Sequence, residues 1–336
     1  MQRDGATALR YYSAPTVVAA MPGIDARLAL AERTLTALVS DAELPPKIGI
    51  HPRPAESFVH AMPAYLRGRE PDGREDLVGM KWVAGFGSNN ELGLPAIHAL
   101  VVLNDPATGE PSAILDGGPI TAARTAAVSG VAIRRFGPVT DRPPRPPRAT
   151  LIGAGVQGRS HLPVLGHVLP GVELVLYDRH LDRSEALATE ARRTAGIGSV
   201  AVAVDARAAV ERADVVVTAA SFGPVRQVMT SDWLTPNALV VPVDYATYCA
   251  AEVARDAALF LVDHRGQFLA TRDAGLFDGY PDPTAMIGEA LLDRTPRPPT
   301  GRVVVTHLGV GLADLVFADA IVRRADELGL GVELAR

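Results

Sequence analysis

Three glycines follow a short apolar run at the spacing Gly-x-Gly-x-x-Gly. The run is Ala149–Ile152, the glycines are Gly153, Gly155 and Gly158, and a helical pattern follows them. In a strand–turn–helix setting, the first glycine permits a tight turn and the second lets a pyrophosphate approach the backbone. The third lets the helix pack close to the strand. Free N–H groups at the helix N-terminus favour the anion. The segment therefore predicts a dinucleotide site.

An acidic residue ends the next apolar run and bears on which dinucleotide would bind. Val172–Tyr177 is a predicted strand, and Asp178 follows it. A carboxylate at this place accepts the ribose hydroxyls of an adenosine and repels a 2′-phosphate, which favours NAD over NADP. Arg179 and Arg183 keep NADP as an alternative, because an arginine beside the ribose can accept that phosphate.

Three charged residues in apolar surroundings are candidates for substrate chemistry. Lys81 lies in a strand pattern, where burial would require a partner and would lower its pKa toward proton transfer. Arg124 interrupts an alanine-rich helix and could hold a carboxylate at two points or bind cofactor phosphates. Asp244 follows the apolar run Leu239–Val243, where burial would raise its pKa. The alternatives are a solvated strand face for Lys81 and, for Asp244, the cap of a helix starting at Tyr245.

The histidines and the cysteine carry weaker signals. His307 and His51 are the histidines best placed to matter, although a structural or surface role remains open for both. Cys249 is the single cysteine of the chain, and we expect it to be a packed small side chain rather than a nucleophile. The Cys and His residues show no metal-ligand spacing, so we predict no metal.

Length and composition narrow the class of protein. The 336 residues suggest two domains, and the net charge of −5 without a basic stripe argues against nucleic-acid binding. One cysteine cannot form an internal disulfide, which favours a reducing cytoplasm. The N-terminal residues lack the apolar core of a signal peptide, and no apolar run approaches the roughly 18 residues of a membrane helix. We expect a soluble cytoplasmic protein.

The elements that position these residues begin with a strand-rich region. Helical spacing of apolar residues predicts a helix over Ile24–Ser40, and a polar turn is expected over residues 67–76. A loop is expected over residues 88–93. Strands are predicted at Tyr11–Met21, within residues 47–64, at Leu77–Ala84, and as a hairpin of Ile97–Leu103 and Ser112–Leu115.

A βα alternation dominates the rest of the chain. A helix opened by Thr121 is expected to run to Arg135, and a stiff proline-rich connector over residues 137–148 follows it. Strands are predicted at 149–152, 172–177, 199–204, 214–219, 238–243, 258–262 and 303–306, with helices at 184–194, 206–212 and 313–328. This order predicts a doubly wound parallel sheet, a Rossmann fold, with ligands at the carboxyl ends of its strands. Thr218, Ala219, Ser221 and Asp244 lie at such ends.

Several short motifs resemble those of the ornithine cyclodeaminase and mu-crystallin family. The Arg-Thr-Ala-Ala block that follows an Asp-Gly turn is the most specific of them. The motifs in this chain are Pro46–Lys47, Ala61–Ala64, Gly79–Lys81, Gly93–Pro95, Asp105–Gly109, Leu115–Gly117, Ile120–Ala127, Gly153–Gln157 and Gly309–Asp314. The resemblance covers most of the chain.

The resemblance implies a homodimer and a Rossmann domain inserted into an α+β domain. We expect residues 1–125 with 315–336 to bind substrate and dimerise, and residues 126–314 to bind the dinucleotide. The family's shared chemistry is hydride transfer between a Cα–H beside an amine and a nicotinamide ring.

Site residues follow from the motifs and the resemblance together. Lys81 and Asp244 are the predicted catalytic residues. The predicted substrate contacts are Lys47, Lys81, Arg124, His307 and Leu308. The predicted cofactor contacts are Arg124, Thr125, Gly153, Gly155, Val156, Gln157, Gly158, Asp178, Arg179, Thr218, Ala219, Ser221, Val243 and His307.

Three departures from the cyclodeaminase pattern bear on the reaction. Lys47 replaces an arginine that binds the substrate carboxylate, Tyr248 replaces a lysine, and His307 replaces a serine beside the cofactor. We therefore favour an NAD-dependent amino-acid dehydrogenase or imine reductase. Asp244 keeps an internal cyclodeaminase as the alternative. A nucleotide-dependent binding protein without catalysis, as mu-crystallin is for thyroid hormone, is the rival from another class.

Overall fold

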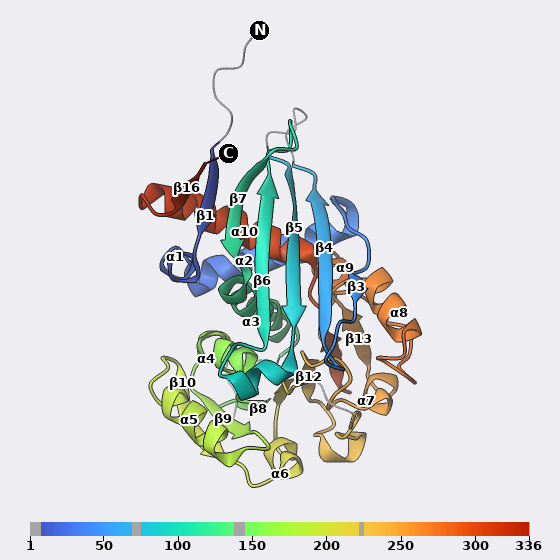
Figure 1. Cartoon of the computed structure of the whole chain (residues 1–336). Helices are drawn as coiled ribbons and strands as arrows, with labels where there is room; N and C mark the ends of the chain where they lie inside the picture. Colours follow the sequence, from blue (N-terminus) through green and yellow to red (C-terminus); the bar gives the residue numbers. More distant parts are fainter. Residues whose placement is uncertain (1–7, 69–74, 138–144, 222–224, 336) are drawn as a thin grey trace. The chain divides into compact units, whose positions relative to one another are not determined.

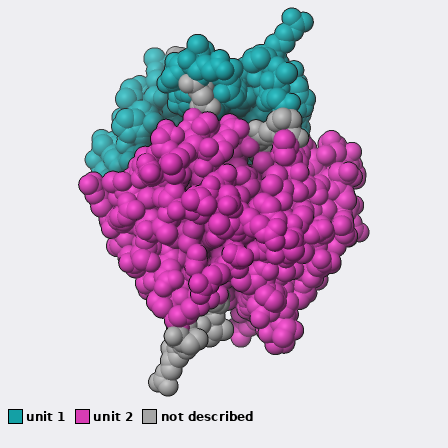
Figure 2. All heavy atoms as spheres, turned by 90° about the horizontal axis from the view of Figure 1, so that it is seen from below, with its two compact units in different colours: residues 1–124, 310–336 teal, residues 125–309 magenta. Residues whose placement is uncertain are grey.

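The computed structural model describes residues 8–68, 75–137, 145–221 and 225–335. The chain divides into two compact units, coloured separately in Figure 2: residues 1–124 with 310–336, and residues 125–309. The first boundary lies inside helix α3 (Gly117–Phe136), and the second immediately precedes α10 (Gly311–Glu327). Each unit contains its own eight-stranded sheet (Figure 1). No helix in the described ranges is both long enough and apolar enough to cross a membrane.

The sheet of the first unit is mainly antiparallel. Its central strands β4 to β7 pair antiparallel in sequence order, β1 joins β7 in parallel, and β3 pairs with β4. The strand order is β16 (Val332–Leu334), β1 (Leu9–Tyr12), β7 (Pro111–Asp116), β6 (Ile97–Asn104), β5 (Leu77–Gly85), β4 (Phe58–Leu66) and β2 (Ala42–Glu43), with β3 at Ile48–Ile50. Residues 97–116 thus form the expected hairpin.

Helices cover one face of this sheet. The helices of the unit are α1 (Ala14–Ala19), α2 (Ile24–Ser40), the 3-10 helix η1 (Gly87–Leu92), the start of α3, and α10. Helix α10 passes behind the central strands and contacts β4, β5 and β6 (Figure 1). Gly311 permits this approach, because a Cβ there would lie 2.3 Å from the backbone oxygen of Met62. The N-terminus of α10 is therefore held directly against β4.

The sheet of the second unit is wholly parallel. Its order is β10 (Ile197–Val202), β9 (Val172–Tyr177), β8 (Arg148–Ile152), β11 (Val215–Thr218), β12 (Leu239–Pro242), β15 (Val303–Thr306), β13 (Leu259–Val262) and β14 (Ala285–Met286). The chain builds outward from β8 to β10 and then returns to β11 on the other side of β8. This is the predicted doubly wound topology, with its switch point between β8 and β11.

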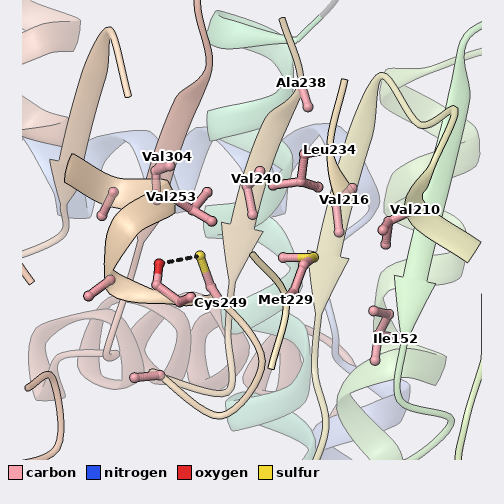
Figure 3. Packing of buried hydrophobic residues seen from close by; sticks show 14 of the residues in the cluster. Ile152, Val210, Val216, Met229, Leu234, Ala238, Val240, Cys249, Val253 and Val304 are labelled. Atoms are coloured by element: carbon pink, nitrogen blue, oxygen red, sulfur yellow. Dashed lines mark hydrogen bonds between the residues drawn. The ribbon is translucent and has the colours of Figure 1, made fainter. Parts of the chain in front are cut away.

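Short helices connect these strands. They are α4 (Val156–Val168), α5 (Leu181–Ala191), α6 (Ala206–Val210), η2 (Ser231–Trp233), α7 (Ala251–Arg255), α8 (Arg265–Asp273) and α9 (Ile287–Leu292). Val216, Val240 and Val304 of neighbouring strands pack in one cluster that includes Cys249 (Figure 3). Cys249 is fully buried, and burial raises the pKa of its thiol to about 12. The expectation of a packed, unreactive cysteine fits this environment.

The structure corrects three local predictions. The strand expected over Tyr11–Met21 ends at Tyr12, because Pro15 favours the first turn of a helix, and α1 begins at Ala14. Helix α3 begins at Gly117 rather than at Thr121, whose hydroxyl donates to the Gly117 carbonyl 2.6 Å away inside the helix. The loop expected at residues 88–93 is largely 3-10 helix. Residues 69–74 of the predicted turn and 138–144 of the proline-rich connector lie outside the described residues.

Candidate functional site: a glycine turn and a buried charge cluster

The glycine turn has the geometry that its spacing predicts. Gly153 follows β8 with a φ of +104°, and a Cβ there would lie 2.3 Å from the Ala219 carbonyl oxygen. A Cβ on Gly158 would lie 2.0 Å from the Gly153 oxygen, so the helix packs against the turn. A Cβ on Gly155 would meet nothing within 4 Å. Gly153 and Gly158 are thus required by the fold, whereas Gly155 leaves open space in front of the turn.

Asp178 is fixed beside this turn by two backbone hydrogen bonds. Its Oδ2 accepts from the Ala154 N–H at 2.8 Å and its Oδ1 from the His180 N–H at 2.9 Å. The carboxylate is therefore tied to the glycine turn in one orientation. It lines a hollow at the carboxyl ends of the strands, together with Gly153, Arg179, Arg183, Ser221 and Tyr248. The hollow thus brings together the predicted cofactor contacts Gly153, Asp178, Arg179 and Ser221, with Arg183 beside them. Tyr248 was not a predicted cofactor contact.

Asp244 is buried at the end of β12 and bound to the end of β11. Its Oδ1 accepts from the Thr218 hydroxyl at 2.7 Å, its Oδ2 accepts from the Ala220 N–H at 3.0 Å, and the residue is 2% exposed. Burial raises the pKa of this carboxyl group to about 6, against the opposing effect of these hydrogen bonds. The alternative of a helix cap is wrong, because Tyr245 has a φ of 57° and the next helix starts at Ala251.

A cluster of buried charges forms in the first unit. Lys81 Nζ donates to Asp314 Oδ1 at 3.0 Å and to the Thr121 hydroxyl at 2.7 Å. Arg124 Nε lies 3.4 Å from the same Asp314 oxygen. Lys81 is 1%, Arg124 6% and Asp314 0% exposed, so the solvated-face alternative for Lys81 is wrong. The next side chain, Trp82, points to the other face of the sheet and is 45% exposed.

The cluster holds two cations and one carboxylate. Burial lowers the pKa of Lys81 to about 8; Asp314 opposes this, and the charges of Arg124 and Lys47 add to it. Arg124 Nε and Asp314 Oδ2 are buried without a hydrogen-bond partner within the part of the chain that the structure describes. The cluster therefore has an excess of positive charge. It also has one donor, Arg124 Nε, and one acceptor, Asp314 Oδ2, that a small zwitterionic ligand could bind.

Sequence reasoning did not assign a role to Asp314. It appeared only as the last residue of the Gly309–Asp314 motif. A signal existed: an acidic residue in the first turn of a helix that otherwise begins with apolar and small residues. Its partners, however, are distant in sequence, as the separation of 233 residues from Lys81 shows.

Lys47 immediately precedes β3 and acts on the same cluster electrostatically. Its charge adds to the effect of burial in lowering the pKa of Lys81. The pKa of His60 is lowered to about 4, first by burial and then by the charge of Lys47. His51 contributes to the shift of His60 as well. Lys47 and His51 therefore lie close enough to this end of the sheet to influence it.

His307 joins a hydrogen-bonded chain that the sequence did not indicate. Its Nε2 lies 2.9 Å from the hydroxyl oxygen of Ser129, which lies 2.8 Å from Nε2 of His161. His307 is 2% exposed, so a surface role is wrong for it. The Leu308 carbonyl accepts from the Tyr245 hydroxyl at 3.4 Å.

The predicted site residues fall into two groups, one in each unit. Lys47, Lys81 and Arg124 belong to the first unit. Thr125, the glycine turn with Val156 and Gln157, Asp178, Arg179, Thr218, Ala219, Ser221, Val243, Asp244, His307 and Leu308 belong to the second. Arg124 and Thr125 are consecutive in α3, at the boundary itself. Within the described residues, no group of three His, Cys, Asp or Glu side chains is arranged to hold a metal ion.

A sequence model of the ornithine cyclodeaminase/mu-crystallin family matches residues 16–264. The chain belongs to this family. The resemblance predicted from the sequence motifs is thereby confirmed, and the family motifs at Pro46–Lys47, Gly79–Lys81 and Ile120–Ala127 lie within the matched region.

Two relatives and one solved structure are similar to this chain over most of their length. The nodulation efficiency protein NfeD of Rhizobium meliloti is 36% identical over 296 residues, 86% of each chain. The ketimine reductase mu-crystallin of Mus musculus is 29% identical over 268 residues, 79% of each chain. The structure of a Δ1-pyrroline-2-carboxylate reductase from Thermococcus litoralis, in complex with NADH and L-proline, has a TM-score of 0.82 at 24% identity. It covers 97% of this chain and 100% of its own. The predicted fold class is confirmed.

Proposed function

We propose that this protein is an NAD-dependent oxidoreductase that transfers hydride at the Cα–N bond of an amino acid or its imine. The observation that carries the proposal is the glycine turn with Asp178 fixed beside it, since this arrangement suits a dinucleotide. Membership in a family with amino-acid dehydrogenases, imine reductases and cyclodeaminases supports the C–N chemistry. The ketimine reductase among its relatives adds to that support.

The second unit has the features a dinucleotide needs. Gly155 leaves space for a pyrophosphate, the first N–H groups of α4 are aligned to bind it, and Asp178 lines the hollow for the ribose. A negative carboxylate there favours NAD, while Arg179 and Arg183 in the same hollow leave NADP as a substitute. The nicotinamide, when bound, supplies the acceptor or donor of hydride.

The first unit has the features an amino-acid carboxylate needs. Lys81 and Arg124 share one oxygen of Asp314, so one unit of buried positive charge is available to a substrate carboxylate. Lys47 adds to this positive potential. The second oxygen of Asp314 offers an acceptor to the substrate N–H. We assign substrate binding to this unit and dinucleotide binding to the other.

Two groups have pKa values suited to proton exchange near neutral pH. The pKa of Asp244 is raised to about 6 and that of Lys81 is lowered to about 8, both mainly by burial. A general acid or base is most effective when its pKa lies near the working pH. We assign the proton transfer that accompanies oxidation of the amine to Asp244 or Lys81.

The test measures NADH formation and NADH binding separately. A dehydrogenase or imine reductase changes the near-ultraviolet absorbance of NADH when given amino acids, or 2-oxo acids with amines. A cyclodeaminase releases ammonia without a net change, and this is the alternative that Asp244 supports. Lys81→Ala and Asp244→Asn should each reduce turnover by about 100-fold or more while NADH binding stays nearly unchanged. Binding of NADH without turnover of any of these substrates would favour a binding protein, and wild-type rates in both variants would refute the assignment.

We further propose that the protein is a homodimer through the open face of the first sheet. A row of apolar side chains crosses four strands on that face, in register from Ile48 through Ala61 and Trp82 to Leu100. Ile48 is 59%, Trp82 45% and Leu100 42% exposed. Contiguous apolar surface of this kind is typical of an interface, and a second copy presents the same row.

Sedimentation tests the dimer directly. Trp82→Glu should shift the protein to monomer, because a buried charge would face the partner's apolar row. Val204→Glu, at a side chain that is 90% exposed in the other unit, is the matched control and should leave the assembly unchanged. A monomeric wild type would refute this interface. The cytoplasmic location stays a prediction.

A further inference from the structure

Four residues of the second unit form a buried chain of hydrogen bonds. His161 Nδ1 lies 2.6 Å from the Gln157 carbonyl oxygen in the first turn of α4. His161 Nε2 lies 2.8 Å from Ser129 Oγ, and Ser129 Oγ lies 2.9 Å from His307 Nε2. Ser129 and His161 are 0% exposed and His307 is 2% exposed. The chain therefore connects the glycine-turn helix with the end of β15, through α3.

The chemistry of these groups fixes the direction of each hydrogen bond. A carbonyl oxygen can only accept, so His161 Nδ1 must carry the proton. His161 is uncharged, because burial lowers its pKa to about 4, and its Nε2 is therefore an acceptor. The single Ser129 hydroxyl proton is donated to that nitrogen. Ser129 Oγ then accepts, and His307 must donate to it through an Nε2–H group.

The fold places His307 away from the adenosine half of the dinucleotide. Asp178 follows β9, and the pyrophosphate turn follows β8. A dinucleotide crosses the carboxyl ends of a doubly wound sheet at its switch point, so its other half extends over β11, β12 and β15. His307 directly follows β15 on this side. Because Nε2 is bound to Ser129, a ligand of the His307 ring would have to be bound by Nδ1.

We propose that Ser129 and His161 are positioning residues that hold His307 in the Nε2–H tautomer, so that its Nδ1 accepts a hydrogen bond from the carboxamide N–H of the nicotinamide. The inference rests on the proposed dinucleotide function and assigns a contact within it. The identity of the proton-bearing nitrogen decides the contact, because an Nδ1–H tautomer would instead donate to the carboxamide oxygen.

The acetylpyridine analogue of NADH separates these two contacts. It keeps the ring carbonyl and replaces the carboxamide NH2 by a methyl group, which cannot donate. Wild-type protein should bind the analogue about fivefold more weakly than NADH, as expected for one neutral hydrogen bond. Equal binding of the two by the wild type would overturn the contact. If the wild type binds neither dinucleotide, the proposed function itself fails.

Two variants of His161 test the positioning role. His161→Leu removes the acceptor for Ser129, which frees the hydroxyl to donate to His307 and to reverse its tautomer, so the preference for NADH should disappear. His161→Gln keeps an acceptor oxygen and should retain the preference. Ser129→Ala provides a second route to the same loss. If the preference for NADH over the analogue survives both His161→Leu and Ser129→Ala, the chain of hydrogen bonds is not its cause.

Nitrogen NMR of the imidazole rings checks the tautomer without any ligand or variant. In the resting wild type, His307 should show a protonated Nε2 and an unprotonated Nδ1, and His161 the reverse. A protonated Nδ1 on His307 would overturn the inference even if NADH binds well. The measurement is therefore independent of the binding assays.

Discussion

The buried charge cluster predicts that removing its carboxylate damages the protein far more than removing one of its cations. Lys81 donates a hydrogen bond to Oδ1 of Asp314, and Arg124 Nε forms an ion pair with the same oxygen at 3.4 Å. Lys81→Met leaves Arg124 and Asp314 as a balanced pair. Asp314→Asn leaves two buried cations without a counter-charge. The two substitutions preserve side-chain size, so the comparison isolates charge.

The burial of the cluster determines how much unfolding free energy each substitution should cost. Removing one partner of a buried ion pair costs about 3–5 kcal/mol when it leaves an uncompensated charge. Lys81 can relieve part of this cost by losing its proton, since its pKa of about 8 would fall further without Asp314. Arg124 keeps its charge. We expect Asp314→Asn to lower the free energy of unfolding by about 3 kcal/mol or more. For Lys81→Met we expect about 1 kcal/mol, mainly from the lost hydrogen bond to Thr121.

Urea unfolding followed by tryptophan fluorescence measures both values. The chain has two tryptophans, and a Trp233→Phe background leaves Trp82 to report on the first unit. The unfolding midpoint should move much further for Asp314→Asn than for Lys81→Met, at unchanged slope. An equal or larger loss for Lys81→Met would show that Lys81 stabilises the fold as a simple ion pair and would refute the charge-excess argument.

The glycine turn, Thr218 and Cys249 of the second unit give three further predictions. Gly153→Ala should lower the melting temperature and weaken NADH binding, because Gly153 has a φ of +104° and a Cβ there would lie 2.3 Å from the Ala219 carbonyl oxygen. Gly155→Ala should fold normally and weaken NADH binding by about tenfold or more. Calorimetry and NADH titration compare the two variants. Thr218→Val removes a donor that lowers the pKa of Asp244, so this pKa should rise from about 6 by roughly one unit and the acid limb of the pH–rate profile should move to higher pH. Cys249 should resist thiol reagents in the native protein and react only on unfolding, because the thiol is buried with a pKa of about 12.

Local patterns in the sequence predicted most of the fold. The helical spacing over Ile24–Ser40 predicted α2 with the bounds that the structure has. Apolar runs predicted seven of the eight parallel strands to within one or two residues, because a strand buried on both faces has few polar positions. The two-residue strand β14 was missed. Helix α1 was missed, since its β-branched residues Thr16, Val17 and Val18 favour a strand when read without the effect of Pro15.

The arrangement of charges could not be predicted in the same way. Lys81 and Arg124 were singled out because charge in an apolar pattern is costly, which is a local argument. Their shared carboxylate, Asp314, comes from a helix more than 200 residues away from Lys81. The contact of His307 with Ser129, across 178 residues, is of the same kind. Periodicity and propensity contain no information on such pairs; only the topology of the two sheets brings them together.

The difference in free energy of unfolding between the wild type and Lys81→Met should also depend on pH. The lowered pKa of Lys81 fixes the sign of this dependence. The folded-state pKa is about 8 and the ordinary value is 10.5, so between these values the unfolded chain holds a proton that the folded chain has lost. Stability attributable to Lys81 therefore rises with pH across this window and is lowest below about pH 8. The full rise is about 3 kcal/mol, from roughly 1.4 kcal/mol for each pKa unit. Lys81→Met should lack it, so a wild-type minus variant difference that stays flat from pH 8 to 10.5 would mean that Lys81 is not held as a destabilised cation.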